Sequence, residues 1–309
     1  MNPPTSTAHF ADRLIERTRT LGHPLCVGLD PHLDLIPELF RRGTMAPNDP
    51  QTVPAVEAFL GAVIDRIAGR VAIIKPQIAF FERLGWRGMR MLDDLCARAR
   101  AAELMVLLDA KRGDIGSTAE GYAGAYLTSD AAMPVDAITL NPYLGFETLE
   151  PFVHAAKDAG RGLFVLVKTS NPGSGDLQDR DVEGEPLFGR VADGLARIEA
   201  DLLGQKTGWS SLGVVCGATW PEQARRVRDA LPKALFLVPG YGAQGASAAD
   251  AVQSFVPGPN GLEGGLVNSS RAILFPESAR AAESTIVWES ALEEALSVAV
   301  EELGSAIQA

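Results

Sequence analysis

The chain has 309 residues, of which 46% are hydrophobic and 22% are charged, a composition typical of a folded globular protein and too apolar for a disordered one. Its formal net charge is −11 and no basic block stands out, which argues against nucleic acid as a partner. No apolar run approaches the roughly 20 residues that span a membrane, and residues 1–10 lack the apolar segment of a signal peptide. The three cysteines, Cys26, Cys96 and Cys216, are far apart and form no C-x-x-C pair, so we expect reduced thiols in a cytoplasmic protein.

Eight short apolar segments recur along the chain and are predicted to be strands. Most of them are continuously apolar rather than alternating, which is the pattern of parallel strands that are buried on both faces. The eight segments are residues 24–29, 71–74, 104–108, 135–140, 163–167, 212–215, 234–238 and 265–267.

Segments with helical patterns separate these strands. They are residues 53–68, 86–102, 117–129, 146–159, 187–203 and 221–230, with further helices predicted at 8–21 and 286–307. Eight strands that alternate with helices predict an α/β fold, a (β/α)₈ TIM barrel with extra N- and C-terminal helices. We expect residues 1–309 to form one domain whose barrel core covers about 24–275. A doubly wound open sheet is the main alternative, but Gly28-Leu29-Asp30 after the first predicted strand is not a G-x-G-x-x-G turn, and the chain has no P-loop motif.

The third strand segment runs into the motif Asp109-Ala110-Lys111-Arg112-Gly113-Asp114. Side chains two positions apart in a strand share a face, so Asp109 and Lys111 should point the same way. Gly113 permits a turn, which would return Asp114 toward Lys111. Two carboxylates around one ammonium would keep the lysine charged and aimed at a substrate.

Polar residues follow most of the predicted strands. In TIM-barrel enzymes the active site lies where the carboxyl ends of the strands gather, so we expect a site at that end of the barrel. The polar residues are Asp30, Lys75, Gln77, Asp109, Lys111, Asp114, Asn141, Tyr143, Lys168, Thr169, Ser170, Asn171, Tyr241, Gln244, Asn268, Ser269, Ser270 and Arg271.

The loops after the seventh and eighth strands are candidates for phosphate binding, because barrel enzymes often hold a phosphate there. Residues 240–245 are rich in glycine, which permits close approach of the backbone, and Arg271 supplies a planar cation suited to phosphate. The loop at 171–185 is long and rich in Gly, Asp and Ser. Such a loop is either a lid over a site or only a flexible connection.

Several of these residues also have simpler interpretations. Asp109 and Lys111 could form only an ion pair at a strand end, although the neighbouring charged residues favour a functional site. Asp30 could equally cap a helix before Pro31, and the glycines of the 240–245 loop could serve only turn geometry. No acidic cluster suggests a metal site, and no metal-ligand spacing relates the four histidines, which are His9, His23, His32 and His154.

Residues 108–118, which contain the Asp109–Asp114 motif, resemble the D-x-K-x-x-D signature of the orotidine 5′-phosphate decarboxylase family. The motif at this strand is shared with related sugar-phosphate enzymes, whereas all the similar segments in order are specific to the family. Over roughly residues 24–275, the chain length and the later loops resemble the longer bacterial branch of the family, often called type 2. The other segments are Gly28-Leu29-Asp30-Pro31, Ile74-Lys75-Pro76, Thr169-Ser170-Asn171-Pro172-Gly173-Ser174, Pro239-Gly240-Tyr241-Gly242-Ala243-Gln244-Gly245 and Asn268-Ser269-Ser270-Arg271.

The resemblance implies decarboxylation of orotidine monophosphate to uridine monophosphate, the last step of pyrimidine synthesis, by a carboxy-lyase without metal or organic cofactor. It also implies a homodimer with active sites at the subunit interface. By this resemblance Lys111 would protonate C6 of the pyrimidine as carbon dioxide leaves, and Asp109 would lie near the substrate carboxylate. Lys75 would join the charged chain and contact the ribose.

The same resemblance implies roles for the residues around this charged chain. Asp114, Ile115 and Thr118 would reach into the active site of the partner subunit. The remaining implied contacts are Asp30 with the ribose hydroxyls, Ser170 with the pyrimidine ring, and Gln244 and Arg271 with the phosphate.

Some alternatives stay open at the level of the sequence. Thr169 and Ser170 are both candidates for the contact with the ring, and residues 139–143 are given no role. A magnesium-dependent sugar-phosphate decarboxylase or synthase of the same superfamily is the nearest alternative function. A non-catalytic nucleotide-binding barrel is a second one, but it would have no need for the Asp-Lys-Asp set.

Overall fold

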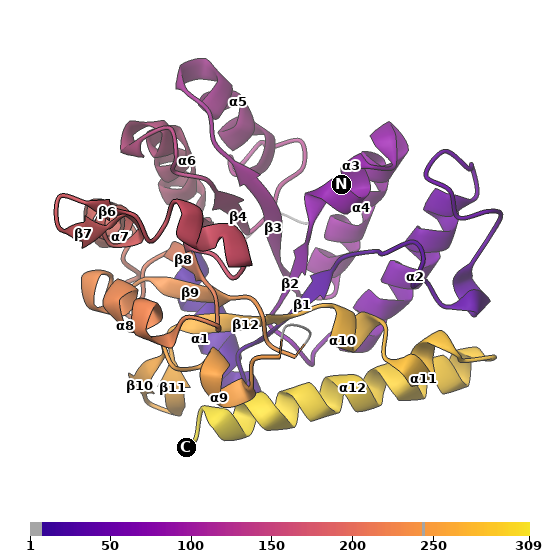
Figure 1. Cartoon of the computed structure of the whole chain (residues 1–309). Coiled ribbons are helices and arrows are strands. Elements are labelled where there is room, and N and C mark those ends of the chain that lie inside the picture. Colours follow the sequence, from indigo (N-terminus) through magenta and orange to yellow (C-terminus); the bar gives the residue numbers. More distant parts are fainter. Residues whose placement is uncertain (1–7, 243–244) are drawn as a thin grey trace.

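The computed structural model describes residues 8–242 and 245–309 of the chain. Eight parallel strands close into a barrel in the order β1-β12-β9-β8-β5-β4-β3-β2 (Figure 1). They are β1 (Leu25–Leu29), β2 (Ile73–Pro76), β3 (Met105–Arg112), β4 (Ala137–Leu140), β5 (Gly162–Lys168), β8 (Leu212–Cys216), β9 (Leu235–Val238) and β12 (Gly265–Ser269). Each of the eight predicted apolar segments forms one of these strands, so the predicted TIM barrel is confirmed.

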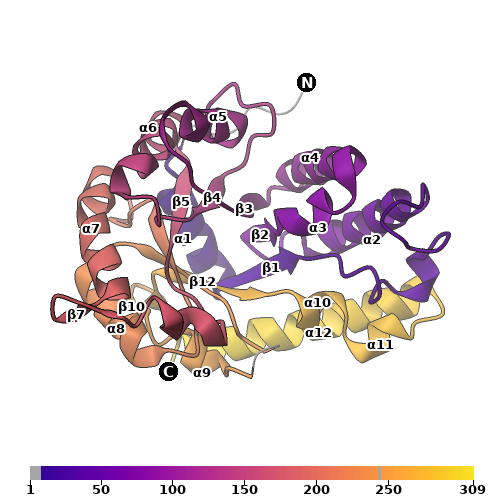
Figure 2. The same cartoon turned by 45° about the horizontal axis from the view of Figure 1, so that its top comes forward.

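Helices surround this barrel on its outside (Figure 2). The longer ones are α2 (Thr52–Ile67), α4 (Gly85–Ala101), α5 (Gly116–Tyr126), α6 (Glu150–Ala159), α7 (Leu187–Asp201), α8 (Pro221–Ala230) and α12 (Thr285–Ala306), together with α1 (Phe10–Leu21) at the N-terminal side. All eight predicted helices are therefore present, close to their predicted bounds, although the segment at 146–159 divides into a 3-10 turn and α6.

Shorter elements complete the described chain. They are α3 (Ile78–Glu82), α9 (Ala248–Ala251), α10 (Arg271–Leu274), α11 (Glu277–Arg280), the 3-10 helices η1 (Glu38–Phe40), η2 (Phe146–Leu149) and η3 (Pro172–Asp176), and two small hairpins, β6 (Asp181–Val182) with β7 (Glu185–Pro186) and β10 (Val256–Gly258) with β11 (Gly261–Glu263). Within the described ranges no helix is long and apolar enough to cross a membrane.

The strands are buried on both faces, as their continuous apolar sequences predict. One apolar cluster lies between the barrel and the outer helices and contains Val106 and Leu108 of β3. A second lies inside the barrel and contains Leu107 of the same strand together with Leu14 and Phe10 of α1. Alternate residues of one strand therefore enter different clusters, which explains why the sequence is apolar at every position.

Helix α1 closes one end of the barrel interior. Phe10 packs edge to face against Phe164 at 6.1 Å between ring centroids. A Cβ atom at Gly162 would come within 2.3 Å of the Phe10 ring, so this position needs glycine. Because α1 covers the end where β5 begins, the open end of the barrel is the one where the strands finish, and the polar strand ends gather there.

Candidate active site

A cavity of about 230 Å³ opens among the carboxyl ends of the barrel strands. Its lining combines charged residues of β2 and β3 with polar residues that follow β5 and with Asn268 of β12. The lining residues are Lys75, Asp109, Lys111, Leu166, Thr169, Ser170, Asn171, Val215, Leu237, Pro239 and Asn268. The structure thus brings Lys75, Asp109, Lys111 and Ser170 together in one cavity, as expected from the sequence.

The centre of the cavity is a chain of three charges. The Asp109 carboxylate accepts a hydrogen bond from Lys111 Nζ at 2.6 Å through Oδ1 and one from Lys75 Nζ at 2.9 Å through Oδ2. Lys75 and Asp109 are buried, whereas the Lys111 side chain is 45% exposed toward the cavity mouth. One carboxylate therefore holds two ammonium groups, and Lys111 is the more exposed of the two.

The burial and the charges of this chain act in opposite directions on its pKa values. Burial by itself would raise the pKa of Asp109, but the two ammonium groups of Lys75 and Lys111 outweigh it and hold that pKa well below the ordinary carboxyl value. Burial would lower the pKa of Lys75, but the charges of Asp109 and Asp30 outweigh it and raise that pKa. Asp109 and Lys75 are therefore both ionised at neutral pH.

The backbone of β3 bends where these residues lie. The pairing of β3 with β4 changes register between Leu108 and Arg112, and Lys111 has a left-handed φ of 48°. The Thr139 hydroxyl of β4 holds this bulge, because it accepts hydrogen bonds from the backbone N–H of Ala110 (3.0 Å) and of Lys111 (2.9 Å). The same hydroxyl donates to Asp109 Oδ1 at 2.9 Å, so one residue of the neighbouring strand orients the whole motif.

The expected return of Asp114 toward Lys111 within one chain is wrong. The Asp114 side chain accepts a hydrogen bond from the backbone N–H of Ile115 at 2.8 Å, and it forms no ion pair with any described residue. Gly113 allows the backbone to pack closely against the segment after β4, since a Cβ atom there would lie 2.5 Å from the carbonyl oxygen of Asn141. Asp114, Ile115 and Thr118 do not line the cavity of their own chain, and Ile115 and Thr118 are both exposed at the surface.

Asp30 lies next to the charged chain, and it does not cap a helix. The residues that follow it are irregular until η1 begins at Glu38, so the interpretation as an N-cap is wrong. Asp30 Oδ1 is buried and has no hydrogen-bond partner within the described residues, as is also true of Asn268 Oδ1 and Ser270 Oγ. Gly28 makes room for Asn268 and Ser270, because a Cβ atom there would lie 2.8 Å from Ser270 Cβ and 3.2 Å from Asn268 Oδ1. Of these three residues, Asn268 lines the cavity, and a polar ligand there would satisfy its unpartnered oxygen.

The geometry distinguishes between the two candidates for contact with a ring. Thr169 and Ser170 both line the cavity. The Thr169 hydroxyl is engaged, because it donates to Asn171 Oδ1 at 2.7 Å and accepts from Gln178 Nε2 at 2.8 Å. The Ser170 hydroxyl has no hydrogen bond among the described residues, so it is the one free to bind a ligand.

The phosphate side of the expected site is described only in part. Arg271 is exposed at the start of α10, and within the described chain its side chain forms no ion pair. Gly240 and Gly242 have left-handed φ values of 107° and 72°, so both serve the turn after β9. Gln244, expected to contact the phosphate, lies outside the described residues.

Three residues of this region had no role in the sequence prediction. Thr139 orients Asp109, Asn268 lines the cavity, and Lys168 is fully buried at the end of β5. Their position at strand ends was visible in the sequence, but which neighbours they meet depends on the closed barrel. In the part of the chain that the structure describes, no three His, Cys, Asp or Glu residues are grouped so that they could hold a metal ion.

Comparisons with known proteins identify the family of the chain. The family model described as Orotidine 5′-phosphate decarboxylase / HUMPS family matches residues 23–285. The chain is 43% identical over 270 residues to the orotidine 5′-phosphate decarboxylase of Rhodopirellula baltica, covering 86% of this chain and 88% of that protein. The corresponding protein of Deinococcus radiodurans is 42% identical over 272 residues, which are 87% of this chain and 90% of that one.

Solved structures agree with the sequence relatives. A crystal structure described as an orotidine 5′-phosphate decarboxylase from Streptomyces avermitilis has a TM-score of 0.77 and 35% identity, covering 96% of this chain and 98% of that one. The OMP decarboxylase of Leishmania donovani has a TM-score of 0.75 and 30% identity, covering 96% and 98%. The match of the family model across the barrel and the identity to these relatives show that the chain belongs to the orotidine 5′-phosphate decarboxylase / HUMPS family.

Proposed function

We propose that this chain decarboxylates orotidine 5′-phosphate to UMP and carbon dioxide, without a cofactor, and that Lys111 delivers the proton to C6. The observation that carries the proposal is the Lys75–Asp109–Lys111 chain at the mouth of a barrel of this family. Of its two ammonium groups, the one on Lys111 is half exposed at the cavity, where it can meet a substrate.

Decarboxylation at C6 requires a charged group like that of Lys111. Loss of carbon dioxide from C6 leaves an electron pair in an sp² orbital that the ring cannot delocalise well. A fixed ammonium aimed at that carbon stabilises the developing charge, and the same group can then transfer its proton to C6. The Asp109 carboxylate, 2.6 Å from Lys111 Nζ, would orient the lysine and favour its charged form before the reaction.

The surrounding residues fit the binding of the rest of the nucleotide. Lys75 and the unpartnered Oδ1 of Asp30 would bind the ribose, and the free hydroxyl of Ser170 would contact the pyrimidine ring. Arg271 and Gln244 would bind the phosphate. Binding energy from this remote group would help to hold the ring against Lys111.

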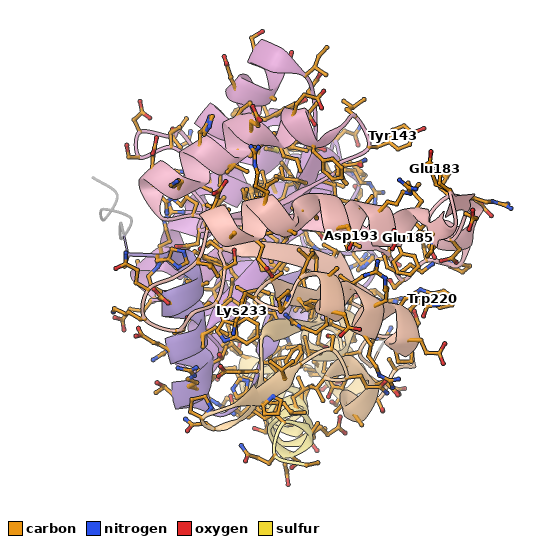
Figure 3. All side chains as sticks on the ribbon, turned by 90° about the vertical axis from the view of Figure 1, so that its left-hand side faces the viewer. Tyr143, Glu183, Glu185, Asp193, Trp220 and Lys233 are labelled. Atoms are coloured by element: carbon orange, nitrogen blue, oxygen red, sulfur yellow. The ribbon has the colours of Figure 1, made fainter. Side chains whose placement is uncertain are left out.

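We also propose that the enzyme is a homodimer in which Asp114, Ile115 and Thr118 complete the site of the partner subunit. Within one chain the Asp114 carboxylate does not meet Lys111, and large apolar side chains are exposed around the same end of the barrel. They are Ile115 (62% exposed), Tyr143 (76%), Leu144 (50%) and Leu177 (57%). Figure 3 shows Tyr143 projecting at the edge of the molecule. An apolar surface that adjoins a charged cavity is typical of a subunit interface.

Two coarser expectations accompany this function. The three cysteines are free and buried, which agrees with reduced thiols, so we propose a cytoplasmic location. We further propose that residues 1–309 act as one domain, because α1 and α12 both pack against the barrel core.

Conversion of orotidine 5′-phosphate, followed by ultraviolet absorbance in the presence of excess EDTA, tests the proposed reaction. We expect rapid loss of the substrate absorbance at the same rate with and without EDTA. The nearest alternative is a sugar-phosphate decarboxylase or synthase that uses magnesium to stabilise an enediolate. Turnover of a sugar phosphate that requires added magnesium, with no conversion of orotidine 5′-phosphate, would establish that alternative. Binding of UMP without turnover of either substrate would establish a nucleotide-binding barrel.

A further inference from the structure

Lys168, the last residue of β5, is a fully buried lysine outside the charged chain of the cavity. Its Nζ donates hydrogen bonds to Asp179 Oδ1 at 2.7 Å and to Ser174 Oγ at 3.2 Å. The ammonium also lies over the ring of Trp220, at 4.7 Å from the centroid. A buried ammonium is costly unless it is paired. Both polar partners of Lys168 lie in the loop that follows β5. The folded loop therefore supplies the hydrogen bonds that the buried ammonium needs.

The loop is tied to the end of β5 at a second place. The Gln178 side chain accepts a hydrogen bond from the backbone N–H of Thr169 at 2.9 Å and donates to the Thr169 hydroxyl at 2.8 Å. The indole N–H of Trp220 donates to the Thr169 carbonyl oxygen at 3.0 Å. Residues 169–179 are therefore folded back over the strand end by contacts on either side of η3.

The C-terminal end of the same connection contacts α8, the helix that follows β8. Arg226 of α8 pairs with Glu185 of β7, and it also meets Asp193 Oδ2 of α7 at 3.1 Å. Figure 3 shows Glu185, Asp193 and Trp220 on neighbouring parts of this side of the molecule. The segment that connects β5 to α7 is thus held at its start by Lys168 and at its end by Arg226.

The position of this loop bears directly on the cavity. Thr169, Ser170 and Asn171 line the cavity, but Lys168 does not. Lys168 is two residues from Ser170, and it is buried and does not line the cavity, so it would act on a ligand through the loop. The Asp179 side chain is 41% exposed, so water can reach the outer half of the ion pair. The contact can therefore open without leaving Asp179 buried and unpaired.

We propose that Lys168 is a positioning residue for the reaction: with Asp179 and Ser174 it holds residues 169–179 closed over the barrel mouth and so fixes Ser170 against the pyrimidine. The inference rests on the proposed function, because it assigns Ser170 to the ring of that substrate. Without the contact, the free loop would sample open positions, and the substrate would have to order it on binding. The loss should therefore fall on KM more than on kcat.

The experiment compares Lys168→Met and Asp179→Asn with Asp176→Asn, a neutral change at an exposed carboxylate of the same loop that makes no ion pair within the described residues. For the first two variants we expect KM for orotidine 5′-phosphate to rise about tenfold or more with kcat within about threefold of wild type. The double variant should raise KM no more than Lys168→Met alone, because both substitutions break the same ion pair between Lys168 and Asp179. Asp176→Asn should behave as wild type.

Limited trypsin digestion supplies a readout that does not depend on turnover. Arg180 is exposed and follows residues 169–179 directly. Its backbone forms hydrogen bonds with Leu177 and Leu187. Cleavage after Arg180 should be faster by about tenfold in Lys168→Met and Asp179→Asn, and saturating UMP should slow it toward the wild-type rate.

Wild-type KM and wild-type cleavage in both variants would overturn the proposal. A fall in kcat with unchanged KM and unchanged cleavage would overturn it as well, since that pattern indicates a disturbance that does not act through the loop. Asp179→Asn, at a half-exposed position, keeps the test valid if Lys168→Met fails to fold. Absence of turnover in the wild type would refute the proposed function instead, while the cleavage rates would still report on the loop.

Discussion

Asp109 connects the chemistry of the cavity to the stability of the barrel. Its carboxylate accepts hydrogen bonds from Lys75, Lys111 and Thr139, and it is the partner that Lys75 needs in order to be buried while charged. The two ammonium groups overcome the effect of burial and lower its pKa. The native state therefore binds the proton of this group less tightly than the unfolded chain does.

Asp109→Asn is expected to lower the free energy of unfolding by about 3 kcal/mol at neutral pH, because it leaves the Lys75 ammonium buried without its partner. Since the native pKa of Asp109 is lowered, its contribution is complete above the unfolded value of about 3.9 and is lost as the pH falls below that value toward the native pKa. Urea unfolding of both proteins from neutral pH down to about pH 3 measures the difference.

The matched control is Asp94→Asn, at an exposed carboxylate whose distance from Arg90 is 3.8 Å. It should change the free energy of unfolding by less than about 0.5 kcal/mol at any pH. A difference between wild type and Asp109→Asn that stays constant toward low pH would contradict the assignment of the lowered pKa.

Gly217 gives Ser170 the room to face the cavity. A Cβ atom at Gly217 would lie 2.8 Å from Ser170 Cβ and 3.1 Å from its backbone nitrogen. Gly217→Ala should therefore displace Ser170 and raise KM for orotidine 5′-phosphate by roughly tenfold, through loss of one polar contact to the ring. Steady-state kinetics measure the effect, with Gly124→Ala, where nothing lies within 4 Å, as the control. Equal KM values in the two variants would mean that Ser170 does not bind the ring.

At the scale of elements, the bulge of β3 depends on a side chain of β4. The Thr139 hydroxyl satisfies two backbone N–H groups that the change of register leaves without a ladder partner. Thr139→Val removes that acceptor and should destabilise the protein by about 1–3 kcal/mol, because buried N–H groups then lack partners. It should also lower kcat, since Asp109 and Lys111 lose their common support.

Thr139→Ser retains the hydroxyl and serves as the control for this prediction. It should preserve kcat within about twofold, because the hydrogen bonds remain while only a methyl group is lost. Thermal unfolding and steady-state kinetics check both variants. Loss of activity in Thr139→Ser equal to that in Thr139→Val would show that the methyl group, not the hydroxyl, supports the motif.

The same strand shows what sequence reasoning can reach. The alternation of a regular strand predicts that Asp109 and Lys111 are neighbours, and they are, at 2.6 Å. The backbone conformation that brings them together is not that of a regular strand, because Lys111 has a left-handed φ and the register of β3 changes. A bulge held by a hydroxyl from another strand leaves no periodic signal in its own segment, so it could not be predicted.

The loop after β5 illustrates a second limit. Its length and composition predict a lid or a flexible connection, but the structure has η3 and the β6–β7 hairpin there. Their strands are two residues long, too short to produce a recognisable pattern. Lys168 was visible only as a polar residue at a strand end, because its burial depends on Asp179 in the folded loop after β5 and on Trp220, which follows another strand of the barrel.

For the whole molecule, the barrel was predictable because burial on both faces makes each strand continuously apolar. The spacing of residues in the sequence did not predict which part of the site a single chain leaves incomplete. Within one chain Asp114 bonds to the Ile115 N–H and does not pair with Lys111, and only the family resemblance supplies a second subunit as its partner. If the enzyme is the homodimer that we propose, the site is completed only on assembly.

Mixing two inactive variants tests the shared site. In a dimer of one Lys111→Ala subunit and one Asp114→Ala subunit, one site would contain an intact Lys111 and an intact Asp114. Random exchange should therefore restore about a quarter of wild-type activity. The control mixes Lys111→Ala with Asp109→Ala: these residues lie 2.6 Å apart in one chain, so no exchange can rebuild a site. No recovery in the first mixture, despite demonstrated subunit exchange, would refute the shared site.

The most direct test of the central claim is the rate of orotidine 5′-phosphate decarboxylation by wild type and by Lys111→Ala, measured by ultraviolet absorbance with excess EDTA. Loss of both the ammonium that stabilises charge at C6 and the proton donor should lower kcat by about 10⁴-fold or more, while UMP binding stays measurable. A Lys111→Ala enzyme whose kcat stays within about tenfold of wild type would contradict the assignment of Lys111 as the proton donor.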